Sequence, residues 1–120
     1  MITPEEILEK LKPIAKLVLN DVPGVDKMEL FNKIMSLENQ GYRCSDFKLL
    51  KRILLWSSSL PELKGELDTL IVKKNHLLEL EDLFGVELKV LDKKIKLTKK
   101  DYKRTIDKVT ELKQQLKYDY

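Results

Sequence analysis

The residues best suited to bind a ligand by charge lie between positions 89 and 104. This stretch holds eight basic residues against two acidic ones, Asp92 and Asp101. The basic residues are Lys89, Lys93, Lys94, Lys96, Lys99, Lys100, Lys103 and Arg104. Such a group attracts phosphates by Coulomb attraction and by release of condensed counterions. The alternative interpretation is a solvated, lysine-rich surface that binds nothing.

The charge changes sign along the chain. The formal net charge is only +3, but residues 1–88 carry a net charge of −3 and residues 89–120 a net charge of +6. The positive excess therefore belongs to the C-terminal part of the chain, and this placement points to an anionic partner.

Residues capable of covalent chemistry are scarce. Cys44 is the only cysteine and His76 the only histidine, and the acidic residues are dispersed along the chain. A Cys–His pair is formally possible, but a small partly buried thiol and a histidine near a helix end explain both residues more simply. No phosphate-binding glycine loop and no metal-ligand spacing occurs. We expect no enzymatic activity, no metal and no cofactor.

The composition bounds the architecture. The chain has 120 residues, of which 42% are hydrophobic and 36% charged, enough for one domain over 1–120 with a buried core. Only four glycines favour helix over sheet. The one cysteine excludes an internal disulfide, and no apolar run is long enough for a membrane span. With no leader segment apparent, we expect a cytoplasmic protein.

Helical periodicity predicts most of the elements that would position these residues. Helices are expected over 3–20, from about 26 to 39, from 45 to about 56, and from about 59 to Asn75, with the last broken from its predecessor by Ser57–Ser59. Pro13 should kink or split the first helix, and Gly41 suits a left-handed turn after the second. A final helix is expected over 99–117, capped by Thr98.

Residues 76–97 allow two interpretations. Val86, Leu88 and Val90, followed by Ile95 and Leu97, alternate with period two, which indicates a β-hairpin with a turn at 92–94. The same stretch also fits a helix. In that alternative the protein is an all-α helical bundle, in which 62–84 forms one long helix packed against 99–117.

The element order and two local motifs resemble a winged helix-turn-helix domain of the MarR- and PadR-like regulators. The resemblance covers residues 45–117. The first motif is the leucine-spaced segment 67–77, in which Asn75 stands where the family usually has glycine. The second motif is the segment 95–102, in which Asp101 stands where the family usually has glycine. It implies a mainly α fold with a small β-hairpin wing over a core of 25–98, preceded by an N-terminal helix and turn (1–24) and followed by a C-terminal helix (99–120).

The resemblance also implies function. The expected protein is a small DNA-binding regulator of transcription whose basic wing, helped by Lys64, contacts the duplex backbone. Flanking helices of such regulators form a homodimer, and the expected interface residues are Leu11, Ile14, Val18, Ile106, Val109, Leu112 and Leu116. The recognition helix, however, carries Glu62, Glu66 and Asp68, which repel phosphates. A non-enzymatic protein-interaction adaptor, or a subunit of a larger assembly, is therefore the alternative.

Overall fold

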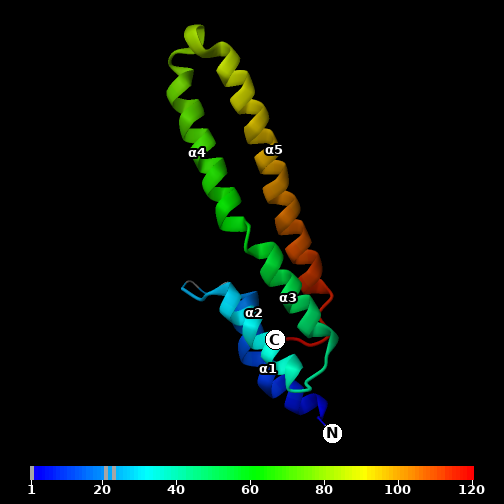
Figure 1. Cartoon of the computed structure of the whole chain (residues 1–120). Coiled ribbons are helices and arrows are strands. Elements are labelled where there is room, and N and C mark those ends of the chain that lie inside the picture. Colours follow the sequence, from blue (N-terminus) through cyan, green and yellow to red (C-terminus); the bar gives the residue numbers. More distant parts are fainter. Residues whose placement is uncertain (1, 21, 23) are drawn as a thin grey trace. The chain divides into compact units, whose positions relative to one another are not determined.

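Five helices account for the regular structure of the chain. The computed structural model describes residues 2–20, 22 and 24–120 (Figure 1). The helices are α1 (Pro4–Leu19), α2 (Lys27–Asn39), α3 (Ser45–Ser57), α4 (Leu60–Leu78) and α5 (Glu81–Gln114). They form two compact units: the first comprises residues up to Ser58 together with Lys108–Tyr120, and the second comprises Ser59–Asp107. Helix α5 contributes to both units.

The first two helices begin at side-chain caps, whereas the N-cap residue of α3, Cys44, makes no capping hydrogen bond through its side chain. The hydroxyl of Thr3 accepts a hydrogen bond from the backbone nitrogen of Glu6 at 3.3 Å, and the carboxylate of Asp26 accepts one from Met28 at 2.9 Å. Gly41 has a φ of +98°, which confirms the left-handed turn that follows α2. Helix α1 continues through Pro13 as one element, so the proline does not split it.

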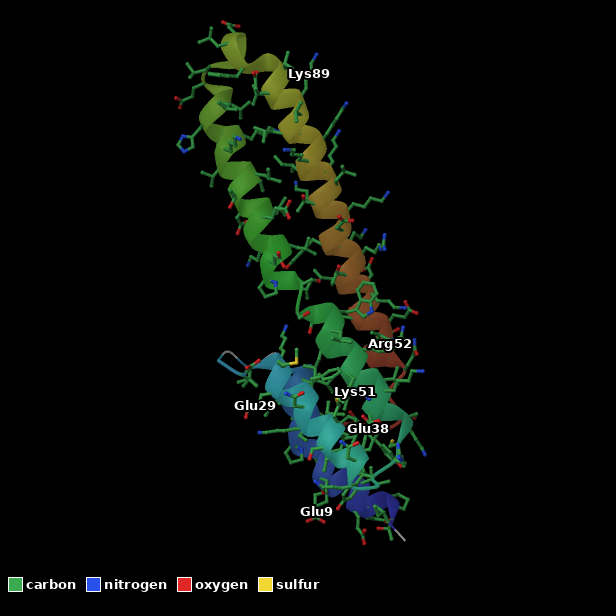
Figure 2. All side chains as sticks on the ribbon, in the orientation of Figure 1. Glu9, Glu29, Glu38, Lys51, Arg52 and Lys89 are labelled. Carbon is green, nitrogen blue, oxygen red and sulfur yellow. The ribbon has the colours of Figure 1, made fainter. Side chains whose placement is uncertain are left out.

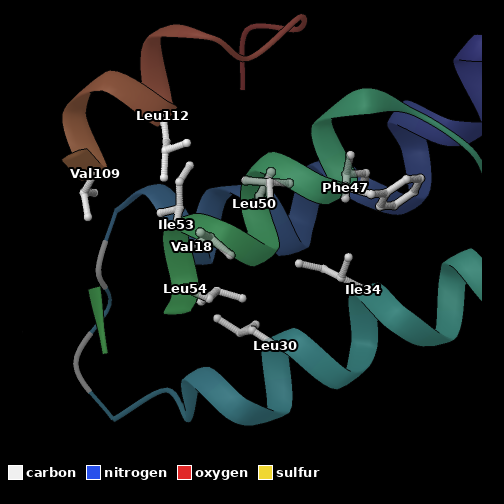
Figure 3. Close-up of a cluster of buried hydrophobic side chains, with 11 residues drawn as sticks. Val18, Leu30, Ile34, Phe47, Leu50, Ile53, Leu54, Val109 and Leu112 are labelled. Carbon is white, nitrogen blue, oxygen red and sulfur yellow. The ribbon is translucent and has the colours of Figure 1, made fainter. Parts of the chain in front are cut away.

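The first unit has a closed apolar core. Leu11, Ile34, Leu50 and Ile53 are fully buried and Phe47 is 1% exposed, and they pack with side chains from the end of α5 (Figure 3). Val109 and Leu112 are those contributions from α5. An ion pair between Lys51 of α3 and Glu38 of α2, both labelled in Figure 2, lies at its surface. Burial of this much apolar surface stabilises the unit without help from a partner.

A buried carboxylate ties the C-terminal segment to α3. Asp46 is fully buried in the first turn of α3 and accepts three hydrogen bonds. Two come from the backbone nitrogens of Lys117 (2.7 Å) and Tyr118 (3.1 Å), and the third comes from the hydroxyl of Tyr120 (2.7 Å). The segment after α5 is therefore part of the first unit and covers its core.

The second unit is a helical hairpin. Side chains facing α4 from α5 follow alternating spacings of four and three, the heptad pattern of packed helix pairs. We call them the seam, and they are Phe84, Leu88, Leu91, Ile95, Thr98, Tyr102 and Thr105. Leucines of α4 at positions 60, 63, 67, 70 and 77 keep the same spacing, and the Nζ of Lys74 lies 2.6 Å from the Oδ1 of Asp92.

The predicted β-hairpin wing is wrong. Residues 86–91, the expected turn 92–94 and residues 95–97 all lie within α5, and the described residues contain no strand. The period-two alternation covers Val86, Leu88 and Val90 and then only Ile95 and Leu97, whereas the heptad pattern continues without a break from Leu88 to Thr105. Leucine, lysine and glutamate, which dominate this segment, also favour helix, and no glycine marks a hairpin turn. The described residues form an all-α fold, as the alternative interpretation expected, but the single long helix that it placed over 62–84 is wrong, because α4 ends at Leu78 and α5 begins at Glu81.

Two predicted helix boundaries are also wrong, because the helices continue through the residues that were expected to end or begin them. Asn75 does not end the fourth helix, which continues to Leu78, and Thr98 is not a cap but a buried residue in the middle of α5. In a helix-turn-helix, the two helices would cross over one shared group of apolar side chains. Here these side chains are divided between the two units. Phe47, Leu50 and Leu54 lie in the core of the first unit, while Leu63, Leu67 and Leu70 lie on α4 in the hairpin.

Candidate interaction surfaces

Five lysines form a continuous stripe along α5. We call this stripe the lysine face, and its members are Lys89, Lys93, Lys96, Lys100 and Lys103. All five are exposed, and their spacings of four and three place them on one side of the helix, over about 21 Å at 1.5 Å per residue. Figure 2 labels Lys89 near the start of α5 and shows nitrogen atoms along the side of α5 that is directed away from α4.

The other predicted basic residues lie around this face rather than in a loop. Lys99 and Arg104 are exposed on α5 beside the lysine face, and Lys64 is exposed on α4. Lys94 lies on the opposite flank, where it lines a groove with Lys73. The structure therefore distributes the predicted basic group over a helix surface, with five of its eight members aligned.

Most of the residues predicted for a dimer interface are used inside the chain. Leu11, Val18, Val109 and Leu112 are buried in the core of the first unit. Ile14 and Leu116 are partly buried against that core, and Ile106 is 38% exposed on α5. The apolar faces of the first helix and of the last turns of α5 thus pack into one core within the first unit.

Sequence reasoning missed an exposed apolar stripe on α5. Its members are Leu83, Val86, Val90 and Leu97, and we call them the outer stripe. Leu83 and Val86 are 74% exposed, Leu97 is 63% and Val90 is 48%. Val86, Val90 and Leu97 have spacings of four and seven, so they lie on one side of α5. Leu83 precedes Phe84, whose φ of −121° and ψ of 27° interrupt the helix, so it adds an exposed apolar side chain at the start of the stripe without sharing its helical face. The seven-residue spacing of Val90 and Leu97 is the sequence signal that could have found the stripe.

Between α4 and α5, near the end of the hairpin, lies an apolar groove. It encloses about 360 Å³ and its walls include Leu77, Phe84, Val90 and Leu91, with Lys73 and Lys94 at its sides. No residue of α4 is buried, although leucines occupy its heptad positions. The leucines of α4 at these positions are partly buried, whereas Leu88, Leu91 and Ile95 of the seam are only 5–7% exposed.

His76 and Cys44, the two residues considered for catalysis, lie in different units. His76 is exposed on α4, and Cys44 is partly buried against the core of the first unit. Among the described residues no group of histidine, cysteine and acidic side chains is placed to hold a metal ion. Phe47 lies in the core of the first unit, and Tyr42 and Trp56 pack against that core.

One titratable group is strongly perturbed. The pKa of the Tyr120 hydroxyl is raised far above its ordinary value, first because burial disfavours the phenolate and second because the hydroxyl donates to the carboxylate of Asp46. This arrangement holds the C-terminal segment in place and has the geometry of a structural clamp. A groove of about 370 Å³ lies beside this clamp, with Leu19, Lys113 and Tyr120 among its walls.

Comparisons of the chain with protein-family models, with curated proteins and with solved structures found no match. Within the described ranges, none of the helices combines the length and the apolar character that crossing a membrane requires. The functional argument therefore rests on the surfaces themselves.

Proposed function

We propose that this chain is a non-catalytic protein-interaction module, whose helical hairpin completes its apolar packing against a helical partner. The observation that carries the proposal is the outer stripe. Large apolar side chains exposed at helical spacing mark interaction sites when they are contiguous, whereas isolated ones are ordinary. Here Val86, Val90 and Leu97 follow one face of α5, and the two valines also line the groove beside α4.

The energetic state of the hairpin supports the same proposal. Short helices gain most of their stability from tertiary packing. In α4 none of the leucines at heptad positions is buried, so the helix gains less than its sequence allows. A helix laid along the outer stripe covers the apolar side of α5 and the groove in one step, as in other cases of helix-in-groove recognition.

Site-specific photocrosslinking in the organism that produces the protein tests this proposal. A photoreactive phenylalanine derivative is placed singly at position 83, 90 or 97, and a matched control carries it at the exposed polar position 75. We expect discrete crosslinked protein bands from the three outer-stripe positions and none from position 75. Equal labelling at all four positions, or no protein adduct at any of them, contradicts the proposal.

A second candidate function is binding of a nucleic acid backbone by the lysine face. The observation that favours it is the alignment of five exposed lysines with no carboxylate among them along that side of α5. Binding of this kind neutralises phosphates without base recognition, because the face offers no arginine and no planar hydrogen-bonding side chain to a base edge. The acidic residues of α4 that argued against a recognition helix lie on the other helix and do not interrupt the face.

Salt dependence distinguishes this candidate. Five phosphate contacts on a duplex predict a slope of about −4.5 in a plot of log binding constant against log salt concentration. The variant K93E/K96E/K100E should bind much more weakly and lose more than half of that slope. The matched control K10E/K12E/K16E makes the same charge change on α1 and should keep the slope. Equal losses in the two variants attribute any binding to net charge and reject the lysine face as a site.

A further inference from the structure

We propose that the partner helix that covers the outer stripe is amphipathic and acidic, with a line of aspartate or glutamate side chains along one of its edges. This inference rests on the proposed function, since it names the chemistry of the occupant of the same surface. It depends on the charges that border the apolar residues of α5, because charge distinguishes helical partners whose apolar faces are alike.

The outer stripe and the lysine face share one row of exposed positions on α5. Beyond the interruption at Phe84, exposed residues follow alternating spacings of four and three, which place them on one side of the helix. We call them the mixed row, and they are Val86, Val90, Lys93, Leu97, Lys100 and Arg104. The mixed row holds three apolar residues, three basic residues and no acidic residue. A helix that covers its apolar members therefore also lies along its basic members.

One flank of the mixed row is basic. The residue before each member of the row lies about 100° around the helix, always on the same side. Four of these six residues are lysines, namely Lys89, Lys96, Lys99 and Lys103. The other two are Gly85 and Asp92, and the carboxylate of Asp92 lies 2.6 Å from the Nζ of Lys74 on α4. The partner's edge on this flank therefore faces four lysines, and the single acid beside them is already paired.

The opposite flank has no single sign. The residues that follow the members of the row are Glu87, Lys94 and Asp101, together with three residues of the seam. Glu87 and Lys94 also line the groove beside α4. A broad anionic surface, such as a duplex or an anionic bilayer, would reach over both flanks and meet the two carboxylates. A single helix is about 10–12 Å in diameter and faces each flank with a separate edge, so its acidic edge meets only the lysines.

Recognition of such a helix combines two kinds of contact. Apolar side chains at matching spacings supply the packing, and charged side chains along the edges select the partner and its orientation. An acidic edge lies against Lys89, Lys96 and Lys103 with opposite charge, whereas a basic edge brings like charges together and weakens the pair. The mixed row extends over about 27 Å, so the partner helix has about 18 residues, or about five turns.

Three synthetic peptides test the proposal in binding assays with the full chain. The acidic probe is a helical peptide of about three heptads, with leucines along one face and glutamates along one edge of that face. The basic probe replaces each of these glutamates by lysine, and the non-apolar probe replaces each leucine by alanine. Fluorescence anisotropy at one fixed ionic strength should give a dissociation constant at least tenfold lower for the acidic probe than for either of the others.

Reversal of the basic flank tests the role of charge. K89E/K96E leaves the apolar members of the mixed row in place, so this variant should still bind a helix but should prefer the basic probe to the acidic one. The matched control K10E/K12E makes the same charge change on α1 and should keep the preference of the natural chain. Circular dichroism checks that both variants remain helical.

Removal of the apolar contact tests the outer stripe. V90Q/L97Q replaces two apolar members of the mixed row by polar side chains and keeps every charge. It should weaken binding of the acidic probe at least tenfold, because the peptide then gains only from its charges. Vesicles of phosphatidylserine and phosphatidylcholine, and a nonspecific DNA duplex, are titrated in parallel and should bind more weakly than the acidic probe.

The other outcomes contradict the proposal. Equal affinities for the acidic and basic probes, or equal effects of K89E/K96E and its control, show that the charge beside the mixed row does not select the partner. Binding of the vesicles or the duplex without binding of the acidic probe assigns the surface to a lipid or a nucleic acid. If no probe binds but photocrosslinking from position 90 yields discrete protein adducts, the proposed interaction function stands and only the acidic class of partner fails.

Discussion

The two units of this protein bury their apolar side chains to different extents. In the first unit three helices and the end of α5 surround a core in which Leu11, Ile34, Leu50 and Ile53 have no exposed surface. In the hairpin, α4 buries none of its residues, and α5 exposes Leu83, Val86 and Leu97 by more than half. The contrast shows that the first unit covers its large apolar side chains within one chain, whereas the hairpin leaves several of them exposed.

The largest expected effect comes from opening the closed core. Phe47→Ala removes a nearly fully buried ring and should lower the free energy of unfolding by about 3–5 kcal/mol. Leu83→Ala, on the 74%-exposed side chain of the outer stripe, should change it by about 0.5 kcal/mol or less. Urea unfolding followed by the fluorescence of Trp56, the only tryptophan, measures the first unit. If both substitutions lower the free energy of unfolding by similar amounts, the stated difference between the two units is wrong.

Removal of the buried carboxylate should have the next largest effect. Asp46→Ala leaves the backbone nitrogens of Lys117 and Tyr118 and the hydroxyl of Tyr120 without their acceptor. We expect a loss of about 2 kcal/mol, below the sum of three bonds because the released segment regains contact with water. Protease cleavage after Lys117 should accelerate as well. Asp46→Asn, which keeps one acceptor oxygen, should lose less, and an unchanged cleavage rate in Asp46→Ala contradicts the clamp.

A smaller and pH-dependent effect is expected at Tyr120. Tyr120→Phe removes one hydrogen bond to a carboxylate and should cost about 1 kcal/mol at pH 7. Because the folded-state pKa of Tyr120 is raised, the unfolded chain releases the proton first, at about its ordinary value of 10.0. The natural chain therefore loses stability above pH 10, and its advantage over Tyr120→Phe should shrink there. A constant difference from pH 7 to pH 11 contradicts this account.

The smallest effect is expected from the ion pair between the two helices of the hairpin. Lys74 and Asp92 are 34% and 46% exposed, so solvent screens their attraction. A double-mutant cycle with Lys74→Ala and Asp92→Ala, read by circular dichroism at 222 nm, should give a coupling energy of about 0.5 kcal/mol or less. A coupling several times larger would mean that the hairpin is held by its charges and depends less on a partner than we propose.

How far the sequence predicts the fold differs between the same two regions. The starts of the first three helices follow from Thr3, Asp26 and Ser45, and the turn at Gly41 from its need for a positive φ. These signals are local, so they hold without knowledge of the tertiary fold. The helix break at Ser57–Ser59 is likewise where it was expected.

The β-hairpin predicted within residues 76–97 is wrong because a strand-like and a helical period coexist in that segment. Val86, Leu88 and Val90 alternate as in a strand, while Leu88, Leu91 and Ile95 repeat as in a helix facing a partner. Short apolar runs are ambiguous in this way, and only the continuation of the seven-residue pattern to Thr105 decides between them. The clustering of the lysines is visible in the sequence, but their alignment into a face depends on the helix.

The clamp at Asp46 could not be read from the sequence at all. An aspartate in the first turn of a helix is ordinary and is explained by the helix dipole. Its actual partners lie more than seventy residues further along the chain, and two of them are backbone groups that leave no sequence signal. The C-terminal tyrosines were expected to fray or to dock on another molecule, and the structure instead places Tyr120 against the chain's own α3.

Hydrogen exchange of the isolated full chain tests the central claim most directly. We predict that amides of α1, α2 and α3 are strongly protected, because their side chains pack into a core within one chain. Amides of α4 and of residues 84–98 of α5 should exchange at least tenfold faster, because no residue of α4 is buried. Protection of the hairpin equal to that of the first three helices would contradict the account.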